Sequence, residues 1–235
     1  MNDMSNAPIP ESRPEGVLQI WMKALTKPNE QTFADLASSP NAKASTAYMW
    51  VFVAGLIQLF LVALVQNRIA GSYMQQFGLG DDFSFGNRGV GAILLGAICG
   101  APIGAAVSTL FFAIGVFLIQ WIAKMFGGRG TADQLAYAMA AISAPYSIVA
   151  GFLSLLAAIP YVGYCFSGLL AIAGIYIFVL NIMAVKGVNQ IGWGAAIGSV
   201  LIPGLVIGFL CACLVGVSVA TLIPMLRQAA PNLTP

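Results

Sequence analysis

The fold is decided by residues 134–185, QLAYAMAAISAPYSIVAGFLSLLAAIPYVGYCFSGLLAIAGIYIFVLNIMAV, which contain no aspartate, glutamate, lysine or arginine. A helix needs about 20 apolar residues to cross the hydrocarbon core of a bilayer, which is roughly 30 Å thick. As a single helix this stretch would measure about 78 Å, so it must hold two spans. The run IPYVGY at 159–164 supplies the proline and glycine that separate them. The stretch therefore predicts a protein that crosses the membrane more than once.

The rest of the chain supports the same class. Of its 235 residues, 59% are hydrophobic and only 8% are charged, whereas ordinary soluble chains carry roughly 25% charged residues. The apolar runs do not alternate with polar residues, as the strands of a membrane barrel would. We predict an all-α integral membrane protein, a bundle of five transmembrane helices at about 47–66, 97–123, 135–158, 166–185 and 196–222.

The N-terminal part divides into two. Residues 1–16 are polar and contain prolines, which predicts a disordered cytoplasmic tail. Residues 17–46 predict two short amphipathic, interfacial helices, one ending at Thr26-Lys27-Pro28 and a second at about 29–37 with Phe33 and Leu36 buried. The first has an apolar stripe of Val17, Leu18, Trp21, Met22 and Leu25. The membrane domain then occupies 47–226, and 227–235 form a short outside tail.

Basic residues set the expected orientation, because lysine and arginine collect on the cytoplasmic side. With a cytoplasmic N-terminus, that side holds Arg13, Lys23, Lys27, Lys43, Lys124, Arg129 and Lys186. The other side then holds only Arg68, Arg88 and Arg227. We expect a protein of the cell (inner) membrane with its C-terminus outside.

The composition also excludes function classes. None of the predicted spans contains a residue charged at pH 7, and the chain has no histidine. Proton-coupled carriers and most enzymes need such groups as relays, acids or bases. We therefore expect a non-enzyme without a metal or cofactor. The net charge of +2 is too small to indicate nucleic-acid binding.

One candidate site lies in the third predicted span. Pro145 lies between Ser143 and Ser147, with Tyr146 adjacent, and Asn181 is a strong hydrogen-bonding group of the next span. A proline at membrane depth can form a hinge or the lining of a path. The alternative is that proline is simply common in membrane helices and that Asn181 bonds a neighbouring helix.

A second candidate site lies on the cytoplasmic side, where a protein partner could dock. Its residues are Trp21, Lys23 and Phe33 of the short helices and Gly127, Gly128 and Arg129 of the loop after the second span. The alternative is that the short helices pack on the bundle. In that case the loop is a flexible turn, followed by a helix cap at Thr131 or Asp133.

Small residues repeat every four positions in several spans, as at Gly96, Gly100 and Gly104 and at Ala136, Ala140 and Ala144. Such faces let helix backbones approach closely in lipid. They predict either tight packing within the chain or a homo-oligomer.

Several of these features resemble the Yip-domain membrane proteins, named for Ypt/Rab-interacting proteins, in their bacterial form. They are Gly127-Gly128 after span two, Pro145-Tyr146-Ser147 in span three, Ile159-Pro160 at the next turn, and Trp21, Thr26-Lys27-Pro28 and Phe33 before span one. The resemblance covers about residues 17–225 and implies five spans. Eukaryotic relatives bind Rab-type GTPases and commonly carry an Asp-Leu-Tyr-Gly-Pro motif before the first span. That motif is absent here, so the resemblance does not extend to Rab binding.

The leading hypothesis is a non-enzymatic, multi-pass protein that contacts membrane lipid and organises the membrane or binds a protein partner as a scaffold. The alternative is a channel or permease component for a small solute.

Overall fold

The computed structural model describes residues 16–76, 90–157, 159, 162–206, 208–209 and 213, and all regular structure within them is helical. The helices are α1 (Val17–Thr26), α2 (Glu30–Ser38), α3 (Ala44–Gln76), α4 (Val90–Met125), α5 (Ala132–Ala157) and α6 (Val162–Asn189), followed by a shorter apolar helix, Trp193–Val206. The all-α class is therefore confirmed for the described part of the chain.

Within those residues, four helices are long and apolar enough to cross a membrane: Ala44–Val65, Leu94–Met125, Ala132–Leu156 and Gly168–Asn189. They coincide with the first four predicted spans. The helix Trp193–Val206 covers the first half of the fifth predicted span. Most of the remainder lies outside the described residues, as do residues 1–15 of the tail predicted at 1–16 and the whole tail predicted at 227–235. The fifth span therefore stays a prediction.

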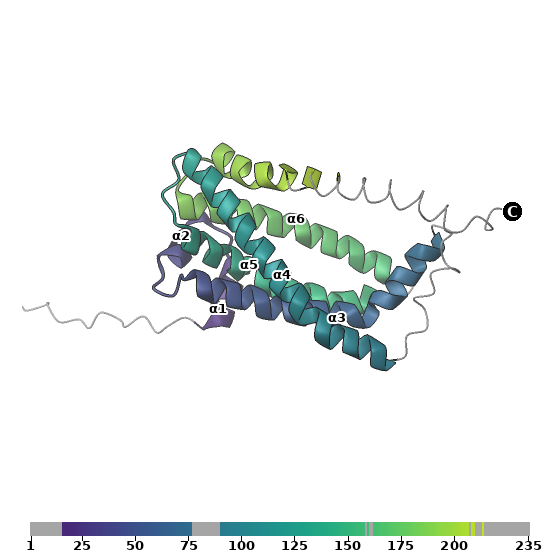
Figure 1. Ribbon diagram of the computed structural model, residues 1–235. Helices are drawn as coiled ribbons and strands as arrows, with labels where there is room; N and C mark the ends of the chain where they lie inside the picture. Colours follow the sequence, from purple (N-terminus) through teal and green to yellow (C-terminus); the bar gives the residue numbers. More distant parts are fainter. Residues whose placement is uncertain are drawn as a thin grey trace, which may run out of the picture.

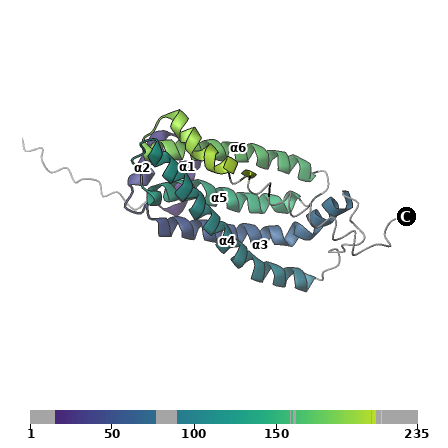
Figure 2. The same ribbon diagram turned by 45° about the horizontal axis from the view of Figure 1, so that its top comes forward.

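Helix α5 lies between α3 and α6, and α4 crosses the bundle obliquely (Figures 1 and 2). The predicted small-residue face of α5 is buried inside the chain, with Ala136 and Ala140 0% exposed and Ala144 1% exposed. Close approach of α3 and α5 is also visible at Gly151, where an added Cβ would lie 2.9 Å from the Cα of Gln58. Packing within the chain thus accounts for this face.

Two helices are longer than the spans predicted for them. The first span was predicted to end at about residue 66, but α3 continues to Gln76. The second span was predicted at about 97–123, and α4 runs without interruption from Val90 to Met125 and passes through Pro102. Inside a bilayer the backbone must satisfy its own hydrogen bonds, so an apolar segment stays helical despite a proline that removes one donor.

The two short helices fold over one end of the bundle, where α3 and α5 begin and α4 and α6 end (Figure 1). We call this the capped end. Aromatic side chains attach α1 to the capped end. The ring centroids of Trp21 and Trp50 are 5.8 Å apart, and those of Trp50 and Tyr137 are 5.0 Å apart. In α2, Phe33 and Leu36 are buried as predicted, at 0% and 3% exposure.

The predicted apolar stripe of α1 was only partly right. The structure buries Ile20 and Ala24 against the bundle and leaves Leu18 and Met22 71% and 63% exposed. This helix is apolar on two sides, so periodicity alone could not tell which side packs on the protein. The result is a short helix that is anchored by one face and presents an apolar second face outward.

Candidate functional sites

The loop after α4 is shaped by three glycines. Gly127 adopts a φ of 85°, in the left-handed region that favours glycine. A Cβ on Gly128 would lie 2.8 Å from the backbone oxygen of Ala123, and one on Gly130 would lie 2.8 Å from that of Val188. The loop therefore lies against the ends of α4 and α6 with no space for side chains at these two positions.

A pair of buried amide side chains holds this loop. Gln120 of α4 and Asn189 of α6 are 3% and 0% exposed. The Gln120 Nε2 group donates to the Asn189 Oδ1 atom at 2.8 Å and to the Gly130 carbonyl at 2.6 Å, and the Asn189 Nδ2 group donates back to Gln120 Oε1 at 3.1 Å. The Arg129 backbone N–H donates to the Asn189 carbonyl at 3.1 Å. We call this cluster the amide lock.

The amide lock corrects the interpretation of the loop as a flexible turn. Its backbone is fixed by buried hydrogen bonds, because an amide that is desolvated must find partners. The predicted cap is confirmed at Thr131: its hydroxyl oxygen accepts from the Gln134 backbone N–H at 3.3 Å, and its own N–H donates to Gln134 Oε1 at 3.0 Å.

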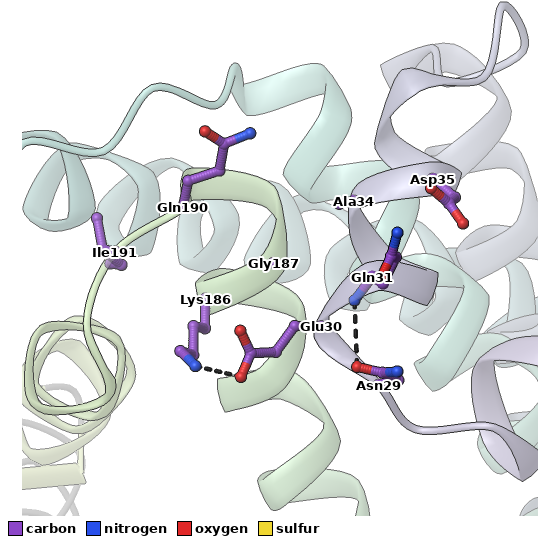
Figure 3. Close-up of a pocket in the computed structure, with 9 residues that line it drawn as sticks. All are labelled: Asn29, Glu30, Gln31, Ala34, Asp35, Lys186, Gly187, Gln190 and Ile191. Carbon is purple, nitrogen blue, oxygen red and sulfur yellow. Dashed lines mark hydrogen bonds and ion pairs between the residues drawn. The ribbon is translucent and has the colours of Figure 1, made fainter.

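Beside the loop, an open cleft of about 660 Å³ lies between α2 and the end of α6. Glu30 and Lys186 form an ion pair across it (Figure 3). The Lys186 ammonium also lies 4.3 Å from the ring centroid of Trp193. The polar lining residues are Asn29, Glu30, Gln31, Asp35, Lys186 and Gln190.

Gly187 brings the two walls of the cleft together. A Cβ on this residue would lie 2.5 Å from the backbone oxygen of Glu30 and 3.1 Å from the Phe33 Cβ. A side chain there would push α2 away from α6. The position of α2, and with it the shape of the cleft, therefore depends on glycine at this contact.

A second cavity, with a volume of about 210 Å³, lies between α3, α4 and α5 of the bundle and opens at Ser108, which is exposed. The predicted path residues Ser143 and Ser147 both line it, together with Gln58 and Ser108. Pro145, Tyr146 and Asn181 are not among its lining residues. The Tyr146 hydroxyl lies toward α6, 3.8 Å from the position of a Cβ on Gly174.

Comparison with known proteins identifies the family of most of the chain. A family model described as the Yip1 domain matches residues 22–215. The chain belongs to the Yip1-domain family. No curated protein and no solved structure matches it significantly. The match confirms the resemblance seen in the sequence and includes the amide lock, the cleft and the bundle cavity.

In this Yip1-domain protein, the predicted docking residues do not form one surface. Phe33 is buried on the inner face of α2, Trp21 packs on Trp50, and Lys23 is half-buried. Gly127 and Gly128 shape the locked loop, and the side chain of Arg129 is exposed beside it.

The cleft residues Glu30, Asp35 and Lys186 were not predicted as a site. One signal pointed to Lys186: it is the only charged residue between Asp133 and Arg227. A lone charge at the end of so long an uncharged stretch needs a partner or water. Its partner Glu30, however, comes from a helix far away in sequence, and only the fold brings the two together.

Proposed function

We propose that this Yip1-domain protein is a non-enzymatic membrane scaffold that binds a protein partner in the cleft at its capped end. The observation that carries the proposal is the cleft itself, which is built by α2 and α6 and has charged and amide side chains on both walls. Its volume of about 660 Å³ is large enough for several side chains of a partner. The distribution of basic residues favours a cytoplasmic location for this end.

The charges of the cleft indicate what a partner would present. Glu30 and Lys186 neutralise each other. Asp35 and Gln31 are exposed along the same side of α2. A partner segment with a basic or amide side chain could therefore pair with Asp35 while its backbone bonds the amides. Rim charges of this kind set specificity and association rate more than total affinity.

The outward face of α1 supports the membrane-contact part of the proposal. Leu18 and Met22 lie one helical turn apart and are largely exposed, while Ile20 and Ala24 hold the helix on the bundle. An amphipathic helix in this position can lie in the membrane interface with its apolar face in contact with lipid. The protein would thus hold a partner close to the bilayer surface.

The experiment compares two charge reversals at the capped end. Tagged protein is cross-linked in its native membrane and purified as wild type, Asp35→Lys and Asp133→Lys. Both aspartates are exposed, but only Asp35 lines the cleft. We expect a stoichiometric protein partner that is recovered with wild type and Asp133→Lys and lost with Asp35→Lys. Equal recovery of the partner with all three proteins would show that the partner does not bind in the cleft.

A second candidate function, a channel or permease component, is favoured by the cavity inside the bundle. Its lining by Ser143 and Ser147 agrees with the predicted path residues. The test is uptake of glycerol or urea by proteoliposomes. Wild-type protein should raise the uptake rate above that of empty liposomes, and Ser143→Val with Ser147→Val should remove the increase. No increase with wild type would argue against passage of these solutes.

A further inference from the structure

The bundle cavity brings four polar side chains together between helices that are long and apolar enough to cross a membrane, with Ser108 at its exposed edge. Ser143 and Ser147 are on α5, Gln58 is on α3 and Ser108 is on α4. By helical rise, Ser143 and Ser147 lie about 17–23 Å along α5 from its start at the capped end. In a hydrocarbon core roughly 30 Å thick that begins at this end of α5, the two serines lie between the midplane and the far side. Polar groups at this depth are costly unless something satisfies them.

Several hydrogen-bond donors and acceptors of the cavity remain available to a ligand. Ser143 donates its hydroxyl proton to the Met139 carbonyl at 2.9 Å, and Ser108 donates to the Ala105 carbonyl at 3.0 Å. Each of these oxygens can then only accept from a ligand. Among the described residues, the Gln58 amide and the Ser147 hydroxyl make no side-chain hydrogen bond. The amide can both donate and accept, and so can the hydroxyl.

Together these groups fit one class of ligand. The serine acceptors require hydrogen-bond donors, and the Gln58 NH₂ group requires an acceptor, so the ligand must carry both. No lining residue is charged, and an ion without a counter-charge would be unstable at this depth. The volume of about 210 Å³ is below the roughly 300–1,000 Å³ of pockets for drug-sized ligands. It exceeds by far the space of about 30 Å³ that one water occupies.

We propose that this cavity is a binding site for a small, uncharged solute that carries hydroxyl or amide groups, held by Gln58, Ser108, Ser143 and Ser147. Water fills the site when the solute is absent. The inference deepens the second candidate function and rests on the same cavity, but it requires only binding and not passage across the membrane. Absence of solute flux would therefore not contradict solute binding in the cavity.

The test measures the reactivity of a cysteine placed in the cavity. Ser147→Cys is compared with Val149→Cys, which lies two residues on, about 200° around the same helix, and is 55% exposed on the bundle surface. Both variants carry alanine at the four native cysteine positions. The reagent is 2-hydroxyethyl methanethiosulfonate, which is small, polar and uncharged. It reacts with the thiolate, which forms only where water reaches the sulfur.

We expect Ser147→Cys to react at least about tenfold faster than Val149→Cys, because only its sulfur lies in a hydrated site. Glycerol or urea added to the membranes should then slow the reaction at position 147 and leave that at position 149 unchanged. Equal rates at the two positions would overturn the inference. Fast labelling that neither glycerol nor urea slows would overturn the assignment of this solute class.

Changing Gln58→Met separates solute binding from simple access of water. Methionine has a similar length but cannot hydrogen-bond through an amide. In the Ser147→Cys background, Gln58→Met should keep fast labelling and reduce the protection by glycerol or urea several-fold. Full protection in this variant would contradict the role of the amide.

Discussion

Asn189→Ala is the sharpest test of the amide lock. The substitution removes the two hydrogen bonds between Asn189 and Gln120 and the bond from Asn189 Nδ2 to the Val185 carbonyl at 3.2 Å. It also leaves the Gln120 Oε1 atom buried, with Gln120 only 3% exposed. With a net value of about 1 kcal/mol for each bond, the cluster should lose about 2–3 kcal/mol of stability. Because the Asn189 side chain fixes the Gln120 amide that bonds the Gly130 carbonyl, and also packs against Gly128, the loop should open more easily by a similar amount.

Trypsin provides the readout, because Arg129 lies in the loop and its exposed side chain is available to the protease, while its backbone is held by Asn189. A loss of about 2 kcal/mol raises the population of the open loop roughly 30-fold. When opening is fast compared with cleavage, the rate of cleavage follows that population. Cleavage after Arg129 in nanodisc-embedded protein, followed by mass spectrometry of that fragment, should therefore be about 30-fold faster in Asn189→Ala.

Two controls make this prediction specific. Gln31→Ala removes an exposed amide from α2 at the same end of the bundle and should leave cleavage after Arg129 unchanged. Gln120→Ala combined with Asn189→Ala should accelerate cleavage less than the two separate effects together, because the residues are direct partners. Cleavage of Asn189→Ala within about twofold of wild type would refute the reasoning that buried amides hold the loop.

The contacts at the capped end predict the effects of three further substitutions. Gly187→Ala should lower the free energy of unfolding in detergent by about 1–3 kcal/mol, measured by dodecyl sulfate titration, because its Cβ would meet the Glu30 backbone oxygen at 2.5 Å. Lys186→Met should cost about 1 kcal/mol at low salt and less at high salt in thermal unfolding, since it removes a half-buried ion pair and a contact with the Trp193 ring. Gly130→Ala should also accelerate cleavage after Arg129, because the added Cβ would lie 2.8 Å from the Val188 carbonyl oxygen.

Much of the helical architecture could be predicted because the bilayer imposes a simple length requirement on uncharged sequence. Four predicted spans match described helices, and α5 ends at Ala157 and α6 begins at Val162, one on each side of the predicted break. The predicted first span stopped at about residue 66 because Asn67 and Arg68 are polar, but α3 continues to Gln76 through a stretch that contains no proline. Polarity shows where a segment leaves lipid, but it does not show where a helix ends.

The candidate sites could be predicted only in part, because their residues meet through the fold. Ser143 and Ser147 are close in sequence and were found together, but Gln58 and Ser108 join them from two other helices. The glycines of the loop were recognised, whereas their contact with Asn189 was not. Asn189 and Gln120 lie on helices from different parts of the chain, and no local pattern indicates that their amides pair.

Binding of a protein partner in the cleft between α2 and α6 can be tested by photo-cross-linking in native membranes. A photoreactive amino acid is placed at Gln31, inside the cleft, or at Asp133, at the same end but outside it. We expect a discrete adduct with a single protein from position 31, weakened at least about tenfold by Asp35→Lys, and none from position 133. Identical adduct patterns from the two positions, or only lipid adducts from position 31, would contradict it.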